Sequence, residues 1–184
     1  MLSKDDILTL KAVVLFILKN CKDDKRDVYA IVKTAYYAQQ FHFKDFGLPL
    51  FKDQIMALPF GPVPSNVYDI LKQARGEDVS AFHKGEDFNL ASSAIKFENE
   101  YFYAKEEPDL SYLSKSALQC LTQAVQKVSS MDFNEIKEDT HGEEWMRVFH
   151  GEGKNKVMDN VNIAREAGAE EGSINYLKDY LDVV

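Results

Sequence analysis

The chain has 184 residues, of which 45% are apolar and 28% are charged, so its composition is that of a globular domain and not of a disordered chain. The 22 basic and 30 acidic side chains give a net charge of −8, which makes nucleic acid an unlikely partner because phosphate-binding surfaces need clustered positive charge. The longest apolar run, residues 12–18, is too short to cross a bilayer, and the charged start does not resemble a signal peptide, so we expect no membrane partner.

Two helices are predicted in the first quarter of the chain. Apolar side chains recur at helical spacing over about residues 5–20, and Ser3 with Asp6 resembles a capping box that would start this helix. A charged turn follows. The second helix is expected to begin near Asp27 and to end before Gly47.

Residues 47–66 combine turn-forming and apolar residues. They contain four of the five prolines, yet they are rich in Leu, Ile, Phe and Met. A solvent-exposed linker would be polar, so we expect an irregular but packed connector. Pro64 suits the first turn of a helix predicted at 64–75, and Gly76 suits its end.

The middle of the chain contains the best hairpin candidate. Residues 76–93 are polar and are predicted to form a loop. Side chains then alternate over 94–104, and Asn99-Glu100 at the centre of this segment could form the turn. A long helix is predicted over about 109–129.

Short helices are predicted for the last part of the chain. The first covers 132–138, and Thr140 to Glu143 resembles a capping box that opens the next helix. After a break at Gly151, two further helices are expected over about 158–167 and 173–182. The predicted fold class is therefore mainly α, a compact helical domain with one small antiparallel β-hairpin.

The charge distribution suggests a division of the chain. Residues 135–184 hold 12 acidic and 6 basic side chains, a net of −6. We expect a domain at 1–150 and an acidic helical C-terminal appendage, 151–184, that packs on the domain or extends it. Its charge suits either a basic partner or a solvated face.

No motif in the sequence indicates catalysis. The histidines lie in no nucleophile motif, and there is no P-loop and no GxGxxG. His141, Glu144 and His150 match no standard metal-ligand spacing. Cys21 and Cys120 form no CxxC pair and are expected to be reduced thiols in a cytoplasmic protein. We therefore predict a protein that is not an enzyme, with no catalytic residue, no cofactor and no metal.

Two segments are unusual for another reason. Residues 60–64, Phe-Gly-Pro-Val-Pro, should form a stiff loop because the prolines fix φ and the glycine permits angles closed to other residues. Residues 140–145 read as a capped helix whose Trp145 packs in the core. Taken singly, both segments have a purely structural explanation.

Taken in order, these segments resemble the Panacea domain of the SocA-like antitoxin family, which includes phage-associated GepA-like proteins. The resemblance covers about residues 5–150. It is carried by Lys33, Tyr36-Tyr37-Ala38-Gln39, Gly47-Leu48-Pro49-Leu50-Phe51, Ala57, Phe60-Gly61-Pro62-Val63, Tyr68, Thr140-His141 and Trp145. The chain departs from the family pattern at Leu58 and Pro59, since the family commonly has Trp after its Ala, and at 136–139, where the usual Leu-Ser is missing.

The resemblance implies an antitoxin that neutralises a cognate protein toxin, encoded by a neighbouring gene, through direct protein–protein binding. The alternative is a proteolytic adaptor that delivers a toxin to an ATP-dependent protease, and a hydrolase or metal enzyme is a distant alternative. Interface hot spots favour aromatic side chains. The expected partner-binding residues are Phe60, Gly61, Pro62, Val63, Pro64, Tyr68, His141 and Trp145.

Overall fold

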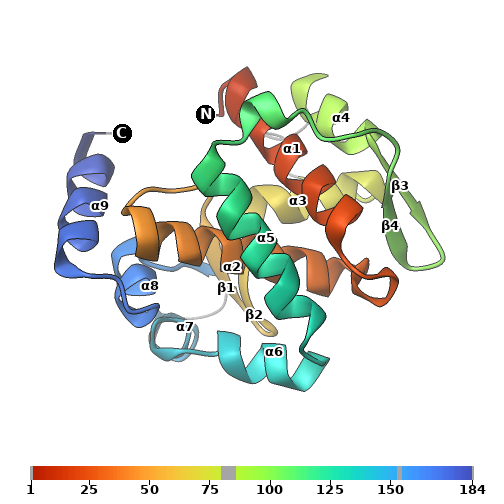
Figure 1. Cartoon of the computed structure of the whole chain (residues 1–184). Coiled ribbons are helices and arrows are strands. Elements are labelled where there is room, and N and C mark those ends of the chain that lie inside the picture. The colour runs from red at the N-terminus through yellow and green to blue at the C-terminus, as the bar shows by residue number, and fades with distance from the viewer. Residues whose placement is uncertain (1, 80–85, 153–154, 184) are drawn as a thin grey trace.

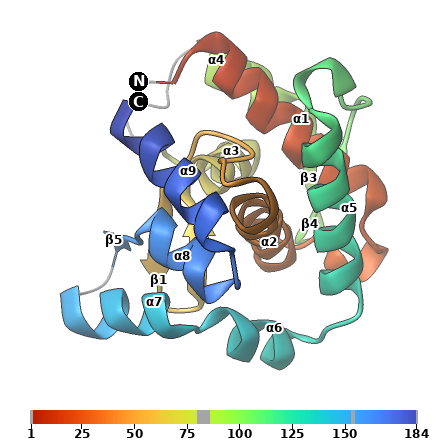
Figure 2. The same ribbon diagram turned by 60° about the vertical axis from the view of Figure 1, so that its left-hand side comes forward.

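The central element of the protein is one buried helix. The computed structural model describes residues 2–79, 86–152 and 155–183. Helix α2 (Val28–Phe46) runs through the middle of the molecule (Figures 1 and 2), with α1 (Lys4–Asn20) and α5 (Lys115–Ser129) on one side and α8 (Asn160–Glu166) and α9 (Glu171–Val183) on the other. Every side chain of α2 from Ala30 to Gln39 is buried. The predicted mainly helical fold class is confirmed.

The first two helices begin and end where local signals predict. Ser3 Oγ accepts from the Asp6 amide while the Asp6 carboxylate accepts from the Ser3 amide, which confirms the capping box of α1. A short 3-10 turn, η1 (Asp23–Lys25), forms the charged connection. Asp27 caps α2, and Gly47 ends it at φ +63°, a left-handed conformation that favours glycine.

The connector predicted over 47–66 is packed as expected, but the prediction that it is irregular is wrong for residues 55–64. Strands β1 (Ile55–Leu58) and β2 (Gly61–Pro64) form an antiparallel hairpin within it, and β5 (Lys156–Val157) pairs with the other edge of β1. Proline disfavours a strand because it cannot donate to a ladder, but edge strands tolerate it, and β2 is an edge strand. Helix α3 (Ser65–Ala74) then starts with Pro64 as its N-cap residue, close to the predicted position.

The predicted hairpin in the middle of the chain is confirmed. Strands β3 (Ile95–Glu98) and β4 (Tyr101–Ala104) pair across Asn99 and Glu100, which both have positive φ as a tight two-residue turn requires. The predicted loop over 76–93 is wrong at its end, since α4 (Glu86–Ser93) is a helix. Residues 80–85 of that prediction lie outside the described part of the chain.

Two predictions near the centre of the second half need correction. The long helix over 109–129 is interrupted near its start, because η3 (Leu110–Tyr112) is a separate 3-10 turn and Ser114 caps α5. The capping box from Thr140 to Glu143 is wrong. Thr140 is the last residue of α6 (Phe133–Thr140), and its hydroxyl donates to the Ile136 carbonyl at 2.8 Å instead of capping the next helix.

The last part of the chain packs on the rest. Helix α7 (Glu143–Met146) contains Trp145 and continues as a π-helical turn, η4 (Arg147–Glu152). The two predicted C-terminal helices are confirmed as α8 and α9. Met158, Ile163 and Leu177 belong to the same buried core as α1 and α2. The boundary between a domain and an appendage at residue 150 stays a prediction.

Candidate functional site

The tip of the β1–β2 hairpin packs against the segment that contains His141 and Trp145. Trp145 Nε1 donates to the Leu58 carbonyl at 2.9 Å, so the indole joins α7 to the end of β1. Its ring stacks on His141, with centroids 3.7 Å apart, and on Phe149, at 4.6 Å. Only 4% of Trp145 is exposed, which makes it a support beneath the hairpin tip.

Gly61 is the point of closest approach beneath this tip. A Cβ at Gly61 would lie 2.5 Å from Lys33 Nζ, 3.0 Å from Thr140 Oγ1 and 3.1 Å from His141 Cδ2. Its φ of +97° is also a conformation that side-chain-bearing residues rarely adopt. Glycine is therefore required both for the turn of the backbone and for the space that three polar groups occupy.

Lys33 is a buried cationic residue beneath the hairpin. Its side chain is fully buried in α2, and Nζ donates to the Pro62 carbonyl at 2.8 Å. Burial lowers the pKa of Lys33 well below 10.5. The pKa of His141 is also lowered, first by burial and then by the charges of Lys33 and Lys137. The underside of the tip is thus an environment that disfavours added positive charge.

Lys33→Met should raise the free energy of unfolding by about 1–2 kcal/mol at pH 7, even though the hydrogen bond to Pro62 is lost. Folding lowers the pKa of Lys33, so below pH 10.5 the unfolded chain binds this proton more tightly than the folded chain does. The free energy of unfolding of wild type therefore falls as the pH drops below 10.5. The stability difference between Lys33→Met and wild type should therefore shrink as the pH rises toward 10.5. Urea unfolding of both proteins at several pH values measures this difference.

Lys44→Met is the matched control, because Lys44 is exposed on the same helix. It should change stability by less than about 0.5 kcal/mol at each pH. A Lys33→Met protein less stable than wild type at pH 7 would contradict the assignment of Lys33 as a destabilising buried amine.

Three aromatic side chains form what we call the aromatic patch, namely Tyr29, Phe60 and Phe133. Phe60, at the hairpin tip, is 61% exposed, and Phe133, at the start of α6, is 47% exposed. Their ring centroids are 6.3 Å apart, and the Tyr29 ring lies 4.5 Å from that of Phe133. Tyr29 and Phe133 are not among the partner-binding residues predicted from the sequence. Spacing gave no separate signal for Phe133, since it lies three and seven residues before the buried Ile136 and Thr140 and so falls on their face of α6.

The remaining predicted partner-binding residues have different surroundings. Pro62, Val63 and Pro64 are buried in β2 and shape the hairpin. Tyr68 is partly buried on α3, where Lys72 Nζ lies 4.9 Å from its ring centroid. The structure therefore brings the hairpin tip together with the His141–Trp145 segment, while the ring of Tyr68 faces Lys72.

Most residues that carried the family resemblance form the framework of the fold. Gln39 shows this most clearly, because its Oε1 accepts from the amides of Leu50 and Phe51, at 2.9 and 3.2 Å, and its Nε2 donates to the Phe51 carbonyl at 3.1 Å. The Tyr-rich helix and the Gly-Leu-Pro-Leu-Phe segment are thus joined by one buried amide. These positions place the hairpin relative to α2 and leave its tip at the surface.

Asp53 is a further structural residue that the sequence analysis did not identify. Its carboxylate accepts from the Asn66 and Val67 amides, at 2.9 and 3.2 Å, and from the Ser65 hydroxyl at 3.0 Å. It therefore caps α3 from the segment before β1, in place of the N-cap residue Pro64, which makes no side-chain cap. This contact fixes the base of the hairpin.

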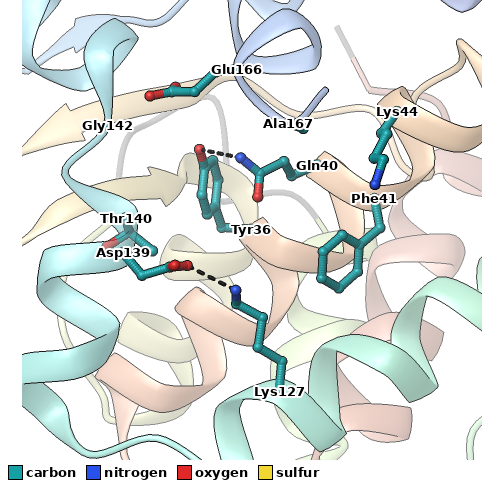
Figure 3. Close-up of a pocket in the computed structure, with 10 residues that line it drawn as sticks. All are labelled: Tyr36, Gln40, Phe41, Lys44, Lys127, Asp139, Thr140, Gly142, Glu166 and Ala167. Carbon is teal, nitrogen blue, oxygen red and sulfur yellow. Dashed lines mark hydrogen bonds and ion pairs between the residues drawn. The ribbon is translucent and has the colours of Figure 1, made fainter. Parts of the chain in front are cut away.

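A polar pocket of about 230 Å³ lies among α2, α5, α6 and α8 (Figure 3). Asp139 on its wall pairs with Lys127 at 3.0 Å and accepts from the Tyr37 hydroxyl at 2.6 Å. Glu166, at the top of the view, accepts from the Glu143 amide. Lys127 and Asp139 are thus paired with each other, while Glu166 is engaged by a backbone amide. The lining residues of the pocket are Tyr36, Gln40, Phe41, Lys44, Lys127, Asp139, Thr140, Gly142, Glu166 and Ala167.

No metal-binding cluster is found among the residues that the structure describes. Of the set considered from sequence, Glu144 is buried and accepts hydrogen bonds from the Arg147 guanidinium, the Asp159 amide and the Asn162 side chain. His141 stacks on Trp145 as described. Within the same described ranges, none of the helices has the length and apolar character needed to span a membrane.

Comparison with known protein families gives a match over most of the chain. The family model described as "Antitoxin SocA-like, Panacea domain" matches residues 31–146. This range begins inside α2 and ends at the last residue of α7, so it contains the hairpin and the His141–Trp145 segment. No curated protein and no solved structure matches the chain.

Proposed function

The chain belongs to the SocA-like Panacea family of antitoxins, and from this premise we propose that it neutralises a protein toxin by binding it directly. The observation that supports this most is the aromatic patch, where Phe60 is largely exposed although Leu58 and Gly61 on either side of the turn are held by Trp145 and by close packing. Large exposed aromatic side chains are frequent anchors of protein interfaces. An exposed Phe on a fixed turn also loses little conformational freedom on binding.

In this proposal the predicted partner-binding residues have two roles. Phe60 contacts the toxin, together with Phe133 and the partly buried Tyr29. Gly61, His141 and Trp145 hold the tip in place from below through the contacts described above. Neutralisation is steric, because the bound antitoxin covers a surface that the toxin needs for its activity.

The double variant Phe60→Ala/Phe133→Ala should weaken the complex about 10- to 100-fold, because it removes both exposed anchors of the patch. Its stability should stay within about 1 kcal/mol of wild type, since both side chains are largely exposed. Titration calorimetry with the purified product of the adjoining gene measures the affinity.

Leu110→Ala is the control, because Leu110 is 50% exposed on η3, away from α6 and the hairpin. It should bind within about twofold of wild type. A double variant that folds and binds as tightly as wild type would remove the patch from the interface.

Co-expression with the product of the adjoining gene tests the function itself. Growth arrest by the neighbour, relieved by this chain with recovery of a stable complex, supports direct neutralisation. Relief that requires an ATP-dependent protease and is accompanied by loss of the neighbour would instead establish the adaptor mechanism. A neighbour that is not toxic would contradict the assignment of that gene product as the cognate toxin.

A further inference from the structure

Helix α9 has an outer face that no element of the described structure is seen to cover. Its inner face buries Ile174 and Leu177 where it packs on α2 and α8. On the other face, Tyr176, Tyr180 and Val183 follow at i, i+4 and i+7, the spacing of one helical stripe. Tyr176 is 56% exposed and Val183 is 87% exposed. Figure 1 shows α9 at the edge of the molecule.

The exposed charges on α9 and just before it are predominantly negative. Glu170, Glu171, Asp179 and Asp182 are exposed on α9 or immediately before it, against the single basic residue Lys178. Asp179 lies three residues from Tyr176, so its carboxylate borders the stripe on the helix surface. A second copy of this chain would bring acidic surface against acidic surface, at a net charge of −8 for each copy. A positively charged partner is the complementary occupant.

We propose that the outer face of α9 binds a basic, lysine- or arginine-bearing segment of the toxin, as a second contact beside the aromatic patch. This inference rests on the proposed function, and it adds the chemistry of the partner. The rings of Tyr176 and Tyr180 offer faces to a guanidinium or ammonium group, and Asp179 pairs with the same cation. Apolar stems of lysine and arginine pack along the stripe.

Helix α9 lies outside the part of the chain that the family model matches, and its acidic charge can also affect how fast the partner associates. The family match ends at residue 146, so α9 lies outside the matched range. This contact is therefore made by a C-terminal segment that the family model does not cover. Acidic charge at the rim of an interface also steers association, so the association rate should fall with added salt.

The test compares α9 variants in binding to the purified product of the adjoining gene at 50 and 300 mM NaCl. Tyr176→Ala/Tyr180→Ala should weaken the complex about tenfold at either salt concentration. Asp179→Lys should weaken it at 50 mM NaCl and reduce its salt dependence. Circular dichroism and thermal unfolding should show native folding of both variants, since the altered side chains are exposed or partly exposed.

Two control variants carry equivalent changes on the distant β3–β4 hairpin. Tyr101→Ala removes an exposed tyrosine from β4, and Glu98→Lys makes the same change in net charge as Asp179→Lys. Both should bind within about twofold of wild type.

The outcomes separate this inference from the proposed function. If wild type binds and the α9 variants bind equally well, the α9 contact is overturned while direct neutralisation stands. If wild type forms no complex, both are overturned. If the chain proves to be a dimer that Tyr176→Ala/Tyr180→Ala dissociates, the stripe is an interface between copies, and the basic partner segment is overturned.

Discussion

Trp145→Ala should lower the free energy of unfolding by about 3–5 kcal/mol, the largest effect among the substitutions proposed for this region. The indole is 4% exposed, stacks between His141 and Phe149, and donates to the Leu58 carbonyl. Alanine would leave a cavity between α7 and the hairpin and an unpaired carbonyl at the end of β1. Urea unfolding followed by circular dichroism measures the loss.

Trp145→Phe separates the contributions of the ring and of the hydrogen bond. It keeps an aromatic ring between His141 and Phe149 but removes Nε1, so it should cost less than the alanine variant, about 1–2 kcal/mol. Trp145 is the single tryptophan in the chain, so its fluorescence in wild type also reports when the hairpin detaches. An alanine variant with the urea midpoint of wild type would show that the indole does not support the fold.

Gly61→Ala should be the second most damaging change, at about 3 kcal/mol, because backbone strain and crowding add at this residue. The strain comes from φ of +97°, and the crowding comes from Lys33 Nζ and the Thr140 and His141 side chains. The new methyl group would push the hairpin tip away from α6 and α7. Binding to the toxin should weaken as well, since Phe60 is the adjacent residue.

Gly76→Ala is the matched control for the strain alone. Gly76 also has a positive φ, +78°, but a Cβ there would meet nothing within 4 Å. Its cost should be about 1 kcal/mol, and the difference between the two variants measures the crowding beneath the tip. Equal costs for the two glycines would mean that Lys33, Thr140 and His141 yield freely, and the tip would then not be rigidly held.

These two substitutions and Lys33→Met act on one contact region. The stability lost at Trp145 or Gly61 would release the tip that presents Phe60, whereas the stability gained at Lys33 would leave its position largely unchanged. A buried amine that lowers stability is unusual in a core, and natural sequences depart from core rules most often near functional sites. Its location beneath Gly61 and Pro62 is consistent with a functional hairpin tip.

The sequence alone predicted those elements whose signals are local. Helices α1 and α2 follow from apolar spacing, from the caps at Ser3 and Asp27 and from Gly47, all of which act within one or two helical turns. The β3–β4 hairpin follows from alternation around a two-residue turn. The order of the motif residues also identified the family, because that order does not depend on how the segments meet in space.

The tertiary structure decided what depends on contacts between distant segments. Strand β1 exists as the centre of a sheet because β5, about 100 residues later, pairs with its free edge, and no local periodicity encodes that partner. The aromatic patch is likewise formed by Phe60 and Phe133 from separate elements. Trp145 is buried because the hairpin tip covers it. Packing decides which side chains are buried and which are exposed. Only the folded chain therefore shows that Trp145 supports the tip from below while Phe60 is exposed on it.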